Sequence, residues 1–177
     1  MAQELVLEKL NLSRKLIDSI KIINLIYNES IMWLYLKKIG IIENSLFRIM
    51  PDGRKVKLID TNYMWLKIIF DNEDYSITAI FNEKMELVEC NFDINLKSYE
   101  NNIIIPSMKN FFINIVISAD GRFYILNENL FLNARKTGLI TTEEYDKVCT
   151  TVLGINSKYY NFGVLKNVCN EYLNYIF

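Results

Sequence analysis

MWLKIIFDNEDYSITAIFNEKMELVECNFDI, the stretch at residues 64–94, contains three runs rich in Ile, Phe, Tyr and other strand-forming residues. The runs Met64–Phe70, Tyr75–Phe81 and Glu86–Ile94 are separated by the polar breaks DNED and NEK. Apolar and aromatic runs of this length, joined by short polar turns, are typical of neighbouring antiparallel strands. This central stretch therefore predicts a meander, and an antiparallel sheet around it.

Further strands are expected on both sides of the meander. The polar segment Asn95–Ser107 is expected to be an irregular loop, and Pro51-Asp52-Gly53 is a strong turn signal. The additional apolar runs are Ile20–Tyr27, Ile31–Leu36 and Lys55–Ile59 before the meander, and the hairpin of Phe111–Ile117 with Arg122–Leu126 after it.

After Leu126 the apolar pattern changes to a helical period. Asn127 is expected to cap a helix that ends near Lys136. The sequence TTEE at residues 141–144 is a capping box, because the threonine hydroxyl can accept the amide of the second glutamate and that carboxylate can reach back. The helix that it opens is expected to reach about residue 153, and a last helix is expected at Lys158–Ile176.

Many short strands followed by helices predict an α+β protein. We expect an antiparallel β-barrel or a strongly curved sheet followed by two or three C-terminal helices. The 177 residues contain no Pro-rich or Gly/Ser-rich linker, so residues 1–177 are expected to be a single domain. Its β-barrel part would span about residues 14–126, and its helical C-terminal part about residues 127–177.

The chain contains no histidine. Ser-His-Asp and Cys-His catalysis and histidine-based zinc sites are therefore excluded. The three cysteines, Cys90, Cys149 and Cys169, are far apart and form no C-x-x-C pair, so neither a thiolate zinc site nor a disulfide framework is expected. Any metal would be a hard cation held by oxygen atoms, such as magnesium or manganese.

The charge pattern disfavours nucleic acid and membrane partners. Twenty basic and 21 acidic residues give a net charge of −1, and no basic cluster of the kind that binds duplex DNA is present. No apolar run approaches the roughly 18 residues of a membrane span, and the N-terminus lacks the pattern of a signal peptide. A cytoplasmic protein with reduced cysteines is expected.

A series of short motifs from Tyr63 to about Leu153 resembles the FomD-like family. That family includes nucleoside di- and triphosphate phosphatases and a hydrolase that releases CMP from a nucleotidyl phosphonate. The resemblance implies a bacterial, divalent-metal-dependent phosphohydrolase scaffold with a β-barrel and C-terminal helices. The motifs, in order, are YMWL at 63–66, ITAIFN at 77–82, PSMKNFFINIV at 106–116, DG at 120–121, LNENLF at 126–131 and GLIT at 138–141.

The resemblance also places a metal site, but asparagines replace most of its carboxylates. The family pattern is approximately D-L-Y-L-D, then D-G, then L-D-E-D-E-L, and here only Asp93 and Glu128 remain acidic at the corresponding positions. Asparagine oxygen is a neutral ligand, so no high-affinity metal site is predicted, with Asp93 and Glu128 as weak candidates. The candidate remnant site is Asp93, Asn110, Asn114, Asn127, Glu128 and Asn129, with Lys109 and Arg122 as candidate phosphate contacts.

Three hypotheses follow. The first is a non-catalytic FomD-like protein, a binding or interaction domain that takes a nucleotide or phosphate-bearing ligand and needs no cofactor. The alternative is an active magnesium- or manganese-dependent phosphohydrolase that uses Asp93 and Glu128, with Glu86 or Glu89 as displaced carboxylates. The second alternative, an RNA-binding module, is disfavoured by the near-neutral charge. A homodimer stays open.

Overall fold

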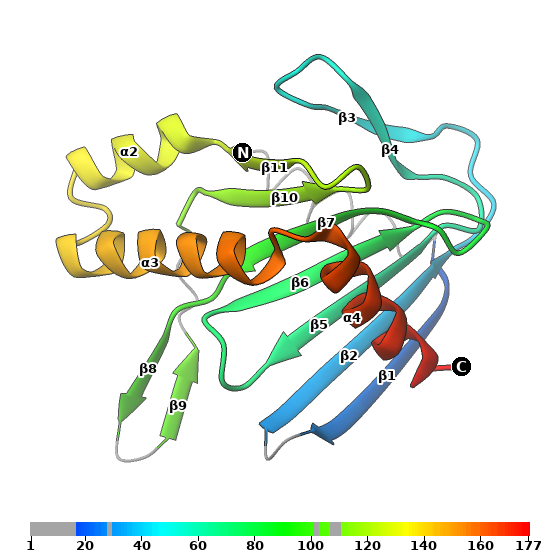
Figure 1. Cartoon of the computed structure of the whole chain (residues 1–177), viewed down its shortest axis with the longest axis horizontal. Coiled ribbons are helices and arrows are strands. Elements are labelled where there is room, and N and C mark those ends of the chain that lie inside the picture. Colours follow the sequence, from blue (N-terminus) through cyan, green and yellow to red (C-terminus); the bar gives the residue numbers. More distant parts are fainter. Residues whose placement is uncertain (1–16, 28–29, 101–102, 107–110) are drawn as a thin grey trace.

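The computed structural model describes residues 17–27, 30–100, 103–106 and 111–177, and its centre is a seven-stranded antiparallel sheet (Figure 1). Every neighbouring pair in the sheet is antiparallel, as the meander at 64–94 predicts. The strands, in spatial order, are β1 (Ile17–Tyr27), β2 (Ser30–Ile39), β5 (Met64–Phe70), β6 (Tyr75–Phe81), β7 (Leu87–Ile94), β10 (Asn114–Ser118) and β11 (Phe123–Leu126).

The sheet is strongly curved and does not close. Strands β1 and β11 are its two ends, and within the described residues no pairing joins them. Of the two predicted forms, the structure is therefore the curved sheet followed by helices, and the predicted fold class is confirmed.

Three helices in the described part of the chain follow the strands: α2 (Glu128–Lys136), α3 (Thr142–Tyr159) and α4 (Phe162–Asn174). Figure 1 shows α3 and α4 lying across one face of the sheet. Alternate strand residues such as Leu34, Leu66 and Ile77 point to this face and are fully buried against helix residues such as Ile155 and Leu165. No helix among these residues is long and apolar enough to cross a membrane.

The capping box is confirmed, but three helix boundaries differ from the prediction. The Thr141 side chain accepts the Glu144 amide at 3.1 Å, and the Glu144 carboxylate accepts the Thr141 amide at 2.8 Å. Helix α3 continues past the expected end near residue 153, because Ile155 and Tyr159 extend its buried face. Helix α4 begins only at Phe162, where Asn161 accepts the Gly163 amide and caps it.

The prediction that Asn127 caps a helix through its side chain is wrong. Asn127 stands at the N-cap of α2, but its backbone is left-handed, with φ of 63°, and its side chain makes no capping hydrogen bond. The asparagine is suited to this position for another reason, since Asn tolerates a positive φ better than most residues.

Two hairpins stand outside the main sheet: β3 (Leu46–Ile49) with β4 (Lys55–Ile59), and β8 (Lys97–Glu100) with β9 (Ile103–Pro106). The expected irregular loop at Asn95–Ser107 is therefore wrong in its described part. The Asp74 carboxylate accepts the Lys97 amide at 2.8 Å, and the Lys97 ammonium donates to two carbonyls of the β5–β6 turn, so tertiary bonds fix the start of β8.

The β3–β4 hairpin covers part of the sheet face opposite the helices. A second apolar cluster fills the space beneath it and includes Leu58 from the hairpin and Tyr63 and Ile80 from the sheet. The Trp65 indole donates to the Leu58 carbonyl at 2.9 Å and joins the two layers. The rest of this second face is open beside the hairpin, and polar side chains lie there.

Candidate functional site on the open sheet face

A row of polar side chains crosses the sheet on the face opposite the helices. Tyr35, Lys67, Thr78 and Asn91 are consecutive partners in the register of β2, β5, β6 and β7. Strand alternation places Lys37 on the same face as Tyr35, and Asp93 on the same face as Asn91. We call these six residues the open-face row; their side chains are half-buried.

The open-face row contains two lysines close to each other. The Lys67 ammonium lies 3.1 Å from the Asp93 carboxylate and forms an ion pair with it. Burial lowers the pKa of Lys37, and the positive charge of Lys67 lowers it further. Because Lys37 receives this repulsion, the face presents positive charge that an anionic group would stabilise.

A buried glutamate lies at the edge of the row, under the β3–β4 hairpin. Glu89 is fully buried, and its Oε1 accepts from Arg48 Nη1 at 2.5 Å and from Asn91 Nδ2 at 2.9 Å. Arg48 Nη1 also donates to Asn91 Oδ1 at 2.8 Å. Among the described atoms, the second carboxylate oxygen, Oε2, has no hydrogen-bond partner, and burial raises the pKa of Glu89.

The structure brings two of the predicted site residues together. Asp93 lies on β7, and Asn114 begins β10, the next strand. The register pairs Ile115 with Phe92, and continuing it by one residue places Asn114 opposite Asp93 on the open face. Residues 21 positions apart in sequence are therefore neighbours, as the FomD-like resemblance requires.

The other predicted residues lie elsewhere or outside the described chain. Glu128 and Asn129 are exposed in the first turn of α2, and the charge of Glu128 contributes to raising the pKa of Tyr145 on α3, so Glu128 faces the helical side. Asn127 is half-buried at the end of β11. Lys109 and Asn110 fall outside the described residues.

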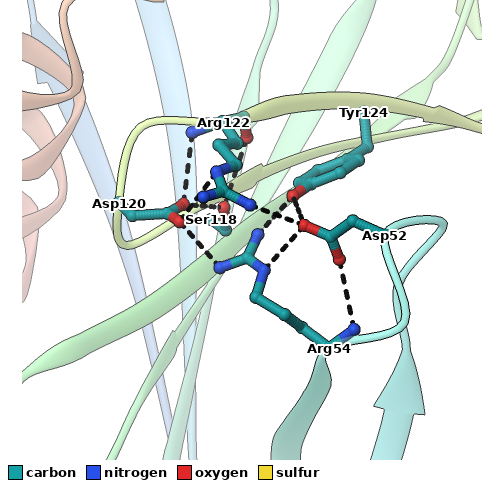
Figure 2. A network of polar contacts seen from close by, with 6 residues as sticks. All are labelled: Asp52, Arg54, Ser118, Asp120, Arg122 and Tyr124. Atoms are coloured by element: carbon teal, nitrogen blue, oxygen red, sulfur yellow. Dashed lines mark hydrogen bonds and ion pairs between the residues drawn. The ribbon is translucent and has the colours of Figure 1, made fainter.

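Arg122 belongs to a separate ion network. It lies in the β10–β11 hairpin and contacts Asp52 at 2.7 Å and Asp120 at 3.2 Å (Figure 2). Because both carboxylates already neutralise it, we infer no phosphate contact for Arg122 from its position.

The open face does not fit a divalent cation of the kind the resemblance implies. Within residues 17–27, 30–100, 103–106 and 111–177, no three carboxylate or cysteine side chains are grouped as metal ligands. Asp93, the one carboxylate of the Asp93–Asn114 pair, is engaged by Lys67, and its partner Asn114 is a neutral amide. A cation would have to displace an ammonium group from its main anionic ligand.

Sequence reasoning missed the cations of this site. Lys37 and Lys67 interrupt apolar strands at outward-facing positions, which is a visible signal. Their proximity could not be derived, because β2 pairs with β5 across an inserted hairpin. Glu89 entered only as a displaced carboxylate, and nothing in the sequence marks it as buried under Arg48.

Comparison with known proteins gives one partial likeness. No family model matches the chain, and no curated protein matches it. Among solved structures, a similar one is the crystal structure of the phosphatase SC4828 with the non-hydrolyzable nucleotide GPCP. It has 12% sequence identity and a TM-score of 0.49, and the match covers 72% of this chain and 67% of that chain. Membership in the FomD-like family stays a prediction.

Proposed function

We propose that this protein is a binding domain for a small phosphate-bearing ligand of the nucleotide class, held on the open sheet face without metal-dependent hydrolysis. The observation that carries the proposal is the pair Lys37 and Lys67 on one uncovered face, with the Lys37 pKa lowered by burial and by its neighbour. A phosphate group between two ammonium groups would relieve their repulsion and form charge-assisted hydrogen bonds.

Aromatic side chains beside the lysines favour a nucleotide over inorganic phosphate. Trp33 is two residues before Tyr35 on β2, points to the same face by strand alternation, and is 41% exposed. Tyr35 is the direct cross-strand partner of Lys67. A base stacked on an exposed aromatic ring gains about 1–3 kcal/mol, so an aromatic group next to two ammonium groups supports a ligand with a base and a phosphate.

Calorimetric titration of nucleoside mono-, di- and triphosphates, with and without magnesium, tests the proposal. The double variant Lys37→Gln/Lys67→Gln should weaken binding about tenfold or more, because two hydrogen bonds from charged donors are lost. Lys166→Gln removes an exposed lysine from α4, on the other side of the sheet, and should leave the affinity unchanged. Unaltered affinity in the double variant would refute the proposed site.

The alternative function, a metal-dependent phosphohydrolase, is favoured by one observation, the adjacency of Asp93 and Asn114. An assay of phosphate release with magnesium or manganese decides between the two. We expect no metal-dependent release above the level without enzyme. Robust hydrolysis that disappears in Asp93→Ala, but not in Asp146→Ala on the exposed side of α3, would replace the binding proposal with catalysis.

A further inference from the structure

The β3–β4 hairpin, residues 46–59, lies over the sheet as a strap. It forms a two-stranded sheet of its own and pairs with no strand of the seven-stranded sheet in the described chain. Its base is fixed by backbone bonds between the end of β2 and the start of β5, Ile39 N to Tyr63 O at 2.8 Å and Asn62 N to Ile39 O at 3.1 Å. Asn62 has a φ of 64°, so the chain turns sharply at this base.

The tip of the strap is fixed by ions to a hairpin far away in sequence. Asp52 accepts from Arg122 at 2.7 Å and from the Tyr124 hydroxyl at 2.8 Å, and Arg54 donates to Asp120 at 2.7 Å. Figure 2 shows the two turns facing each other across these bonds. We call this set the latch; its residues are Asp52, Arg54, Ser118, Asp120, Arg122 and Tyr124.

The latch is an exposed ionic structure. The side chains of Arg54 and Arg122 are 36% and 58% exposed, and those of Asp52 and Asp120 are 30% and 39% exposed. Ion pairs at this exposure are individually weak, and salt screens them. Hydrogen bonds from the two arginines and Tyr124 lower the pKa of Asp52, so the latch holds at any pH above the acidic range.

The middle of the strap carries one further ionic contact to the sheet, Arg48 to Glu89 and Asn91. Beneath it lie the second apolar cluster and the bond from Trp65 to the Leu58 carbonyl. The fixed base, the separate sheet and the ionic attachments at middle and tip make the strap a unit that can leave the sheet without breaking any strand pairing of the main sheet.

We propose that the strap is a hinged cover, turning at Ile39 and Tyr63, which the latch holds down and which lifts when the latch is weakened. Lifting withdraws Arg48 from Glu89 and Asn91 and exposes this end of the open face. The consequence for ligand access rests on the proposed function, whereas the motion itself does not.

The experiment uses Trp65 as a reporter in the absence of ligand. The protein has two tryptophans, so Trp33→Phe leaves Trp65 under the strap as the single one. In this background, Asp52→Asn/Asp120→Asn removes both latch carboxylates. We expect a red-shifted Trp65 emission, stronger quenching by acrylamide, and amide exchange at residues 46–59 about fivefold faster, the effect of losing one or two exposed ion pairs.

A matched control breaks an ion pair inside the strap. Lys57 contacts Asp60 at 2.5 Å without reaching the main sheet, so Asp60→Asn should leave Trp65 quenching at the level of the parent. Unchanged quenching and unchanged exchange in the latch variant would overturn the proposal. So would faster exchange spread evenly over sheet and helices, since that reports global unfolding.

A second measurement needs no latch variant and covers the case in which that variant does not fold. In the Trp33→Phe protein, ionic strength is raised to about 1 M, where the Debye length falls to about 3 Å. Acrylamide quenching of Trp65 should rise while the helical signal stays constant. Quenching that is flat across the salt series would show that the apolar cluster alone holds the strap and would refute the latch.

Discussion

At the residue scale, Glu89 gives the clearest prediction because it is a fully buried carboxyl. Burial raises its pKa above the ordinary value of 4.5, while Arg48 and Asn91 oppose this. The folded protein then binds the proton more tightly than the unfolded chain, so stability falls as pH rises from 4.5 through the raised pKa. In Glu89→Gln this contribution is absent. The difference in unfolding free energy, wild type minus variant, should therefore decrease over that window.

Urea unfolding at a series of pH values from 4.5 upward measures this difference. Asp52 and Asp120 do not interfere, because their lowered pKa values place the loss of their contribution below the ordinary 3.8. A difference that stays constant, or grows with pH, would contradict a raised pKa at Glu89 and would indicate that Arg48 keeps it ionised throughout.

At this scale, the sequence specifies chemistry but not proximity. Asp93 and Asn114 could be paired only through a family resemblance, because a strand pattern does not state which strand lies beside which. Lys37 and Lys67 were visible as charges within apolar strands, yet 30 residues and a hairpin separate them. Their neighbourhood depends on the pairing of β2 with β5, a long-range property of the sheet.

At the element scale, helix α3 contains a glycine that no contact requires. A Cβ added at Gly154 would meet no atom within 4 Å. Gly154→Ala should therefore stabilise the protein by about 1 kcal/mol, the difference in helix propensity. Gly163→Ala in α4 is the matched control, because its Cβ would lie 3.0 Å from the Asn161 oxygen that caps the helix. Urea unfolding should show a clearly smaller gain, or a loss, in the control; equal gains would contradict this account.

The elements that were predicted correctly are those with a strong local signal. Long apolar runs with polar turns identified β5, β6 and β7, and a capping box identified the start of α3. The strands that were missed, β3, β8 and β9, have only four residues each. Runs this short carry too little periodicity to be distinguished from a loop, and a partner hairpin strand and tertiary bonds such as Lys97 to Asp74 stabilise them instead.

At the scale of the whole molecule, the helical layer and the sheet share one apolar core, and this predicts a single cooperative unit. Both tryptophans, Trp33 and Trp65, lie in the sheet, so fluorescence follows the sheet, while far-UV circular dichroism at the helical minimum follows α2, α3 and α4. In urea the two transitions should coincide. Ile155→Ala, which removes a fully buried α3 side chain from this core, should move both together by about 2–5 kcal/mol.

The control for this experiment is Leu153→Ala on the same helix. Leu153 is 68% exposed, so its removal should change the unfolding free energy by no more than about 0.5 kcal/mol. If Ile155→Ala shifted only the helical transition and left the fluorescence transition in place, the helices would be a separate folding unit. The division near residue 127 would then be a domain boundary, and the helix-facing side of the sheet would have to be stable without its cover. The thirty-one buried apolar residues of the shared cluster argue against that outcome, since uncovering the sheet would expose its entire apolar face to water.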